Sequence, residues 1–180
     1  MIKINMGCGK RDFGPNWIHI DAAKFDHVDH YSIEKLDFFE ESTVDLIYAS
    51  HVLSYFDREE IKLLLNEWFR VLKPGGVLRL AVPDFSSMSR LYCDGLIGLN
   101  QIIGPLYGRM KVNDSFIYHK TVYDFVELKK ILEDNGFTNV QKYDWRLTDH
   151  SEFDDHSQAY LPHMDKENGT LISLNIECVK

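Results

Sequence analysis

Two short groups of residues near the amino terminus have the types and spacing that a ribose-containing ligand requires. Gly7-Cys8-Gly9 interrupts an alternating apolar stretch, and glycine lets a ligand approach the backbone closely. Asp21 ends the next apolar stretch, where a carboxylate can accept hydrogen bonds from both hydroxyls of a ribose. Taken singly, the glycines are compatible with a plain turn, and Asp21 with a solvated strand end. Together they predict a nucleoside site.

The glycine loop lacks the pattern of a dinucleotide site. That pattern, GxGxxG, opens a helix onto a pyrophosphate, but the third glycine position here is Asp12. Only residues 10–16 separate the loop from the next apolar stretch, and they include Gly14-Pro15, so no helix N-terminus is available for phosphates. A cofactor with a nucleoside and no phosphate fits better, and S-adenosylmethionine is such a molecule. The short crossover disfavours the alternative of a nicotinamide-dependent oxidoreductase.

Hydrophobic periodicity predicts the elements that position these residues. Asp57 and Glu60 form a capping-box pattern before an apolar stripe that runs to Leu72, which predicts a helix that Pro74-Gly75-Gly76 ends. Further helices are expected over 86–92 and over 123–135, the latter ended by Gly136. Apolar or alternating stretches predict strands at residues 2–6, 17–21, 44–49, 77–82, 140–143 and 171–178. Strands that alternate with helices indicate an α/β fold with a parallel-type sheet.

Ligands of such sheets bind beyond the carboxyl ends of the strands. That rule directs attention to four strand ends, which are Met6–Gly9, Asp21, Ala49–His51 and Val82–Asp84. His51 is a candidate general base, or a structural histidine under the cofactor. Asp84 is a candidate substrate contact, or a turn-former.

Four segments closely resemble the class I S-adenosylmethionine-dependent methyltransferases. They are Asn5-Met6-Gly7-Cys8-Gly9, Asp21, the run from Asp45 to Leu53, and Arg70-Val71-Leu72-Lys73-Pro74-Gly75-Gly76. Their order is similar to that of the small type 11-like branch, which starts directly at the first strand. The resemblance covers residues 2–84 well and extends loosely through His119-Lys120 and 134–137. It implies a Rossmann-like, mostly parallel seven-stranded sheet with helices on both faces, shortened at the N-terminus.

The resemblance also implies a set of cofactor-binding residues and one structural motif. The loop would shape the site under the methionine part of the cofactor, Asp21 would hold the ribose, and Asp37 would reach the adenine amino group. RVLKPGG would end a helix and start a strand, without a catalytic role. The implied cofactor-binding residues are Met6, Gly7, Cys8, Gly9, Asp21, Leu36, Asp37, Phe38, Ala49, Ser50 and His51.

One departure from the family pattern concerns proton transfer. Relatives often read VLEH where this chain has Val52-Leu53-Ser54-Tyr55, so an acid and a histidine are missing near the site. The candidate catalytic residues are therefore His51, Asp84 and His119, and His119 could instead cap the helix that follows it. Tyr107 and Tyr123 could line an acceptor pocket or belong to the core.

Two later segments are harder to interpret. Residues 85–120 are rich in Gly, Tyr and Met, and we expect them to form a lid over the acceptor, or alternatively a dimer contact. His150, His156 and His163 surround Asp154-Asp155, but their spacings match no tight metal-ligand pattern. We therefore expect a solvated loop there and no metal site.

Composition bounds the remaining alternatives. The 180 residues suit one domain, their net charge is −8, and acidic residues crowd positions 21–45, which argues against nucleic acid as the main partner. No run of 18 apolar residues and no signal peptide is visible, and the three cysteines are far apart, so we expect a cytoplasmic protein without a membrane partner. The expected function is methyl transfer to a small-molecule acceptor. A cofactor-binding scaffold without catalysis is the alternative.

Overall fold

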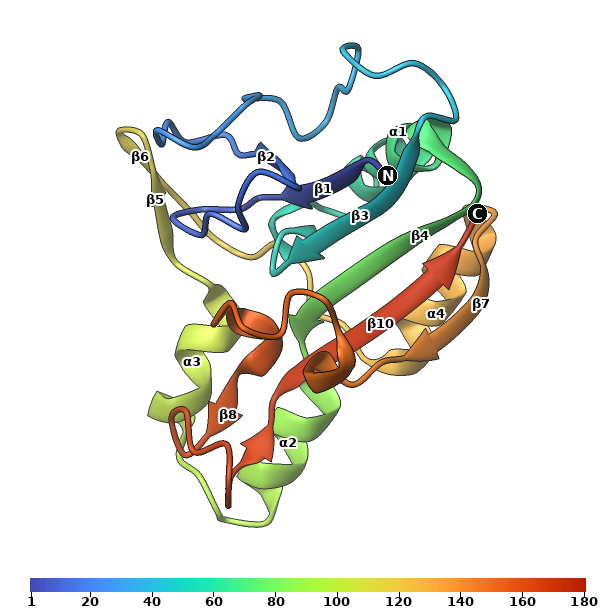
Figure 1. Ribbon diagram of the computed structural model, residues 1–180. Helices are drawn as coiled ribbons and strands as arrows, with labels where there is room; N and C mark the ends of the chain where they lie inside the picture. The colour runs from blue at the N-terminus through green and yellow to red at the C-terminus, as the bar shows by residue number, and fades with distance from the viewer.

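A mixed six-stranded sheet forms the centre of the molecule (Figure 1). The computed structural model describes all of residues 1–180. The first four strands in spatial order are parallel, and β10 runs antiparallel to both of its neighbours. In spatial order the strands are β2 (Ile18–Ile20), β1 (Lys3–Met6), β3 (Val44–Ser50), β4 (Leu72–Pro83), β10 (Ser173–Val179) and β7 (Thr138–Lys142).

The α/β architecture is confirmed, but the seventh strand is absent. Beyond β2 a single parallel bridge joins Ile20 to His30, and the residues around it, such as Asp26 and Asp29, have low strand propensity. The expected C-terminal strand is also divided. Thr170–Leu171 (β9) pairs with Tyr160–Leu161 (β8) in a separate two-stranded sheet, and only Ser173–Val179 joins the central sheet.

One face of the sheet, here called the helical face, carries the aliphatic core. Side chains of alternate residues, such as Ile4, Ile47 and Leu80, point to this face. Two helices, α1 (Glu60–Val71) and α4 (Phe125–Asp134), cover it with their apolar stripes. Both were expected from periodicity. The predicted capping box also forms, because Asp57 Oδ1 accepts from Glu60 N at 3.0 Å and Asp57 N donates to Glu60 Oε2 at 2.7 Å.

The opposite face, here called the loop face, is covered without α-helices. Tyr48 and Leu46 of β3 point to it, and Phe13 and Phe153 pack over them from loops. Short 3₁₀ turns lie nearby, namely η2 (Trp145–Leu147) and η3 (His156–Gln158). The prediction of helices on both faces is therefore confirmed for the helical face, whereas the loop face has only these short 3₁₀ turns. The physical reason is that the β1–β2 crossover, residues 7–17, has no helix, as its length indicated.

The expectation of a solvated loop around the tail histidines is wrong for His150 and Asp155, whereas His156 and His163 are exposed as expected. His150 is 1% exposed and lies against the ring of Tyr48 at 4.0 Å between centroids. Asp155 is 5% exposed, and its Oδ2 accepts from Tyr48 Oη at 2.5 Å. The segment instead forms part of the wall that covers the loop face.

In the RVLKPGG motif the helix ends at Val71, and Pro74-Gly75-Gly76 form a bulge within β4. β4 starts at Leu72, directly after α1, and its register against β3 shifts at the level of Val44 and Leu46. Gly75 has φ +79° there, and a Cβ on Gly76 would lie 2.8 Å from the Lys73 carbonyl oxygen. The glycines thus let the strand pass from the helix into the sheet without a separate loop.

Residues 85–120 lie beyond the carboxyl end of β4. They contain α2 (Phe85–Cys93), which was expected, and α3 (Leu99–Tyr107), whose period the sequence did not reveal. A hairpin of β5 (Met110–Val112) and β6 (Ser115–Ile117) follows, and the turn η1 (Leu53–Tyr55) lies after β3. A small second core joins this region to the tail, formed by Met88, Leu91, Ile97, Ile102, Leu161 and Ile172.

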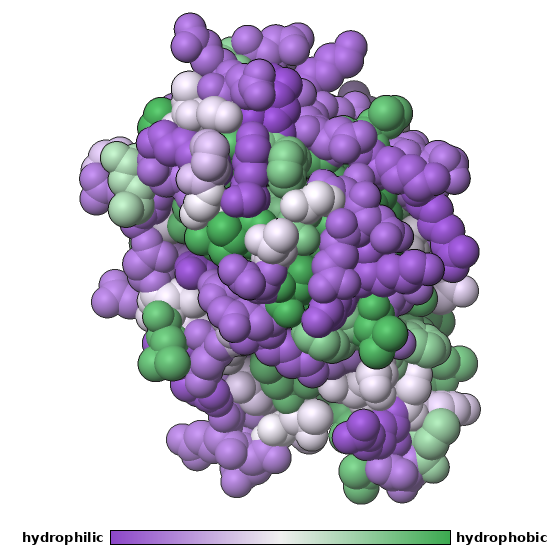
Figure 2. Space-filling view, turned by 90° about the vertical axis from the view of Figure 1, so that its right-hand side faces the viewer, coloured by the Kyte–Doolittle hydropathy of each residue, from purple (hydrophilic) through white to green (hydrophobic).

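The outer surface on the side of α4 and β7 is mostly hydrophilic, with separate apolar areas (Figure 2). None of the helices has both the length and the apolar character needed to cross a membrane. The three cysteines are free thiols.

Candidate functional site

The carboxyl ends of β2, β1, β3 and β4 meet at one edge of the sheet. Met6 pairs with both Ile20 and Ala49, and Ser50 pairs with Ala81, so the residues that follow these strands are neighbours. The glycine loop, Asp21 and His51 are therefore brought together as predicted from the sequence.

The glycine loop and Asp21 are joined by a direct hydrogen bond. Gly9 N donates to Asp21 Oδ2 at 2.7 Å, and Ala23 N donates to Asp21 Oδ1 at 2.7 Å. Each carboxylate oxygen has about two lone-pair directions, so each can still accept one further hydrogen bond. Gly9 has φ +57°, and the position of a Cβ on it has no neighbour within 4 Å. The backbone at Gly9 is thus open to a ligand.

The other residues of the loop are fixed by packing. Gly7 has φ +66°, and a Cβ on it would lie 2.2 Å from a methyl group of Val52, so only glycine fits under the turn after β3. Met6 is fully buried in the core. Burial and the nearby Asp21 carboxylate raise the pKa of the Cys8 thiol to about 12, so it is protonated at neutral pH. A protonated thiol is a poor nucleophile, and Cys8 therefore has a packing role.

The segment 36–38 is placed beside the end of β2. Leu36 is buried, whereas Asp37 and Phe38 are exposed. The Phe38 ring stacks on the ring of His30 at 3.7 Å between centroids. His30 in turn accepts, through its carbonyl oxygen, a hydrogen bond of 3.1 Å from Asp21 N. Residues 36–38 and the Asp21 carboxylate therefore form one continuous region.

The end of β3 contains two buried polar atoms without hydrogen-bond partners, Ser50 Oγ and His51 Nε2. His51 also has φ +55°, a conformation that side chains other than glycine rarely adopt. Its ring lies 4.9 Å from the ring of His156. Burial, together with the nearby His156, holds the pKa of His51 well below its usual range, so the imidazole is neutral at pH 7. Orphaned polar atoms and backbone strain mark this strand end as a candidate ligand site.

Asp84 has a structural role as the N-cap of α2. Its Oδ1 accepts from Ser86 N at 3.0 Å and from Ser87 N at 3.3 Å, and its Oδ2 accepts from Ser87 Oγ at 2.8 Å. The residue is 8% exposed in this environment. These contacts leave its carboxylate little freedom to act on a substrate.

His119 also makes structural contacts, but with α3 and not with the helix that follows it. Its Nδ1 lies 3.1 Å from the Pro105 carbonyl oxygen and 3.2 Å from that of Leu106, at the end of α3. Burial lowers its pKa. A Cβ on Gly108 would collide with its ring, at 2.1 Å from Nε2. Among the tyrosines, Tyr123 is buried and Tyr107 is 58% exposed.

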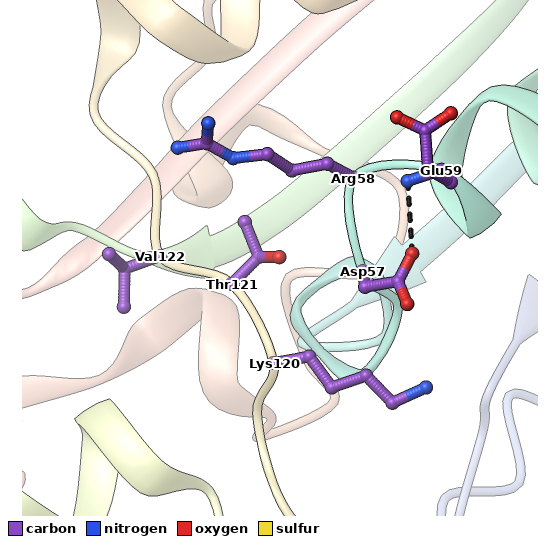
Figure 3. Close-up of a pocket in the computed structure, with 6 residues that line it drawn as sticks. All are labelled: Asp57, Arg58, Glu59, Lys120, Thr121 and Val122. Carbon is purple, nitrogen blue, oxygen red and sulfur yellow. Dashed lines mark hydrogen bonds between the residues drawn. The ribbon is translucent and has the colours of Figure 1, made fainter.

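Two surface hollows accompany the site without overlapping it. One, of about 450 Å³, lies between the start of α1 and the segment before α4 (Figure 3). It is polar apart from Val122, and its other lining residues are Asp57, Arg58, Glu59, Lys120 and Thr121. A second, of about 470 Å³, lies at the amino ends of β1 and β2, the opposite edge of the sheet. Neither is lined by a residue predicted to bind the cofactor.

His156 is the site neighbour that sequence reasoning did not place. It was noted only as part of a histidine-containing tail, yet it covers His51, 105 positions earlier in the chain. No group of three or more His, Cys, Asp or Glu side chains is arranged to hold a metal ion.

Comparisons with known proteins show similarity to methyltransferases. The family model described as "Methyltransferase domain" matches residues 12–80, which include Asp21, residues 36–38 and the end of β3 but not the glycine loop. A solved S-adenosylmethionine-dependent methyltransferase from Archaeoglobus fulgidus is 16% identical with a TM-score of 0.58, and the match covers 99% of this chain and 86% of that chain. The chain has a methyltransferase fold.

Other structures share this methyltransferase fold at similarly low identity. A methyltransferase from Methanosarcina mazei is 17% identical with a TM-score of 0.58, and the match covers 99% of this chain and 92% of that one. The 1,6-didemethyltoxoflavin-N1-methyltransferase from Burkholderia thailandensis was solved with bound 1,6-didemethyltoxoflavin and S-adenosylhomocysteine. It is 13% identical with a TM-score of 0.58, and the match covers 99% of this chain and 70% of that chain. No curated protein matches the sequence.

Proposed function

We propose that this chain is an S-adenosylmethionine-dependent methyltransferase that acts on a small-molecule acceptor. The observation that carries the proposal is the hydrogen bond from Gly9 N to the Asp21 carboxylate, beside an open glycine backbone at the carboxyl edge of a parallel sheet. The methyltransferase-domain match and the methyltransferase fold support it. Among solved relatives, the Burkholderia enzyme was crystallised with a small-molecule acceptor and S-adenosylhomocysteine.

The residues present fit the nucleoside and amino-acid parts of this cofactor. The free lone pairs of Asp21 would accept the two ribose hydroxyls, and residues 36–38 would contact adenine beside them. The open backbone at Gly9 would run under the methionine part. The orphaned Ser50 Oγ and His51 Nε2 supply polar groups at the end of β3, where the sulfur is expected.

The cofactor, when bound, would supply an activated methyl group on a positively charged sulfur. The task of the chain would be to align the acceptor with that group, and orientation of this kind is worth roughly 7–11 kcal/mol in favourable cases. Where the acceptor must lose a proton, His51 is the candidate base, because its imidazole is neutral and its Nε2 has no other partner. Asp84 is a weaker candidate, since both of its carboxylate oxygens cap α2. His119 directs its Nδ1 at carbonyl oxygens of α3, which leaves its Nε2 to accept a proton.

Residues 85–120 would cover the acceptor, as part of the one domain formed by residues 1–180. They project beyond the end of β4 and expose several large apolar side chains, including Phe85, Tyr107 and Phe116. A partly apolar covering of this kind suits a small organic acceptor. A homodimer contact through the same segment is the competing role.

A scaffold that binds the cofactor without catalysis is the second candidate function. The N-cap role of Asp84 favours it, because it removes one of the three predicted proton acceptors and leaves only the two histidines, His51 and His119. The two functions differ in turnover but not in cofactor binding.

Calorimetric titration with S-adenosylmethionine, S-adenosylhomocysteine and NAD tests the proposal. We expect binding of the first two and no response to NAD. Asp21→Asn should weaken S-adenosylhomocysteine binding about tenfold or more, because each lost charge-assisted hydrogen bond is worth about 1.5 kcal/mol or more. Asp26→Asn is the matched control, since Asp26 is an exposed carboxylate in the same connection and should leave the affinity unchanged.

Tight NAD binding alone, or an Asp21 variant with unchanged affinity, would overturn the cofactor assignment. A second assay separates enzyme from scaffold. Transfer of radiolabel from the cofactor to members of a metabolite library should occur with wild type and fall about 100-fold or more with His51→Gln when the acceptor needs a base. Cofactor binding without transfer across the library would favour the scaffold.

A further inference from the structure

The connection between β2 and β3 lacks regular secondary structure, yet it carries the predicted adenine contacts. Residues 21–43 contain turns, bends, one bridging residue and stretches of irregular backbone. A loop of this length has no internal hydrogen-bond ladder to hold its shape, so its position depends on contacts with other elements. β2 supplies such contacts to residues 29–30, and α1 supplies them to residues 36–43.

Two side chains of α1 hold the backbone of this connection at three points. Glu67 Oε1 accepts from Leu36 N at 2.8 Å. Arg70 Nη2 donates to the Leu36 carbonyl oxygen at 3.3 Å, and Arg70 Nη1 donates to that of Phe39 at 3.2 Å. The residues that would contact adenine therefore lie within a stretch held from both ends.

Glu67 and Arg70 also hold each other in a bidentate ion pair, here called the Glu67–Arg70 clasp. Arg70 Nε donates to Glu67 Oε2 at 2.8 Å, and Arg70 Nη2 donates to Glu67 Oε1 at 2.7 Å. Both side chains are partly buried, at 34% exposure for Arg70 and 19% for Glu67. The Arg70 guanidinium also lowers the pKa of Glu67, which keeps the pair ionised. A planar fork of donors is required to serve a carboxylate and two carbonyls at once.

The stretch held by the clasp touches the carboxylate end of β2. Phe38 stacks on His30, and the His30 carbonyl oxygen accepts from Asp21 N. A displacement of residues 36–39 would therefore also change the surroundings of the ribose contact.

We propose that the Glu67–Arg70 clasp is a positioning device for the nucleoside side of the cofactor site. Glu67 and Arg70 would act through the backbone of Leu36 and Phe39 and would not touch the cofactor. The inference rests on the proposed function, and it gives Arg70 of the RVLKPGG motif a role in cofactor affinity as well as in the fold.

Binding titrations on four variants test the clasp. The probes are S-adenosylhomocysteine and 5′-methylthioadenosine, which keeps the nucleoside but lacks the amino-acid part. We expect Arg70→Met to weaken both probes by the same factor, about tenfold. Glu67→Gln should weaken both less, because the amide oxygen of the new side chain can still accept from Leu36 N. Arg70→Lys should bind both probes more tightly than Arg70→Met and more weakly than wild type. Lys62→Met is the matched control, because Lys62 forms an i,i+3 pair with Glu59 on the same helix but does not contact the connection.

Titrations well below the unfolding temperature separate positioning from stability. If Arg70→Met lowers the unfolding temperature but the folded protein binds both probes like wild type, the clasp is only structural and the inference is overturned. Should Arg70→Met fail to fold, Arg70→Lys and Glu67→Gln carry the same comparison. A wild-type chain that binds neither probe would instead overturn the proposed function and, with it, any role of the clasp in affinity.

Hydrogen exchange gives a readout that needs no cofactor. The Leu36 amide donates to Glu67, so its exchange should accelerate about tenfold or more in Arg70→Met relative to Lys62→Met. Unchanged exchange at Leu36 would show that the clasp does not hold the segment, whether or not the chain binds a cofactor.

Discussion

The two faces of the central sheet are built by different physical means. The helical face is covered by two helices with continuous apolar stripes, and its side chains form a single cluster of 26 buried residues. The loop face is covered by irregular segments from both ends of the chain, and it contains stacked aromatic rings, histidines and ion pairs. Arg79, for example, pairs there with Glu177 at 3.2 Å and lies near Tyr143.

Because of this difference, we expect the helical face to set the size of the free energy of unfolding and the loop face to set its dependence on pH. Apolar burial on the helical face is insensitive to protonation, whereas on the loop face burial lowers the pKa of His150. Both faces converge on the carboxyl edge, because α1 supports residues 36–39 and the tail supports His51 through His156. The site is thus held from one side by helix packing and from the other by a polar tail.

The largest expected effect comes from the helical face. Trp68 of α1 is fully buried, and its Nε1 donates to the Ile33 carbonyl oxygen at 3.1 Å. We expect Trp68→Ala to lower the free energy of unfolding by about 3–5 kcal/mol, since it leaves a large cavity and an unpaired carbonyl. Urea unfolding at pH 7 and at pH 5 measures this loss, which should be the same at both.

Leu63→Ala is the control on the same helix. Leu63 is 74% exposed, so its truncation should change stability by less than about 0.5 kcal/mol. A loss below about 1 kcal/mol for Trp68→Ala would contradict the view that the helical face supplies most of the stability.

The sequence predicted the helical face well because its signals are local. The capping box of Asp57 and Glu60 and the apolar stripe of α1 lie within one stretch of chain, and both were found where expected. The proximity of the glycine loop, Asp21 and His51 was also predicted, since each follows the carboxyl end of a recognisable strand.

The loop face could not be predicted in the same way. His150 and Asp155 belong to a polar segment that reads as solvated, and their burial depends on Tyr48, which lies 107 positions before Asp155. The prediction of a seventh strand is wrong for a related reason. The segment at His30 is too polar to extend along the edge of β2, and it forms a single bridge there. The periodicity of apolar residues along the chain gives no information about contacts between residues so far apart in sequence.

The second prediction concerns the pH dependence of the loop face. Burial lowers the pKa of His150 from 6.5 to about 4. Between these values the unfolded chain binds a proton that the folded chain does not, so stability falls as the pH drops from 6.5 toward 4 and is retained above 6.5. The full difference is worth about 3 kcal/mol. Urea unfolding between pH 7 and pH 4 measures it.

His150→Phe should remove this share of the pH dependence. A phenyl ring keeps the stacking against Phe13 and Tyr48 and leaves no buried ring nitrogen, so stability at pH 7 should stay within about 1 kcal/mol of wild type. The free energy of unfolding that this variant loses between pH 7 and pH 4.5 should be about 2 kcal/mol smaller than the loss in wild type. His163→Phe is the control, because His163 is exposed. Equal acid sensitivity of wild type and His150→Phe would argue against His150 as a source of the loop-face response.

The smallest of these effects tests the hydrogen bond that ties the tail to the sheet. Tyr48→Phe removes the hydroxyl that donates to Asp155 Oδ2, while Asp155 Oδ1 still accepts from Ser157 N at 2.7 Å. A buried carboxylate oxygen without its partner costs about 1–3 kcal/mol, so the free energy of unfolding should fall by that amount.

Tyr31→Phe is the control. The ring of Tyr31 is 52% exposed, so this variant should change the free energy of unfolding by less than about 0.5 kcal/mol. The tail should also loosen locally, and faster hydrogen exchange at Ser157 in Tyr48→Phe, with unchanged exchange in β3, would assign the loss to the loop face. An equal change in both would show that the two faces unfold as one unit.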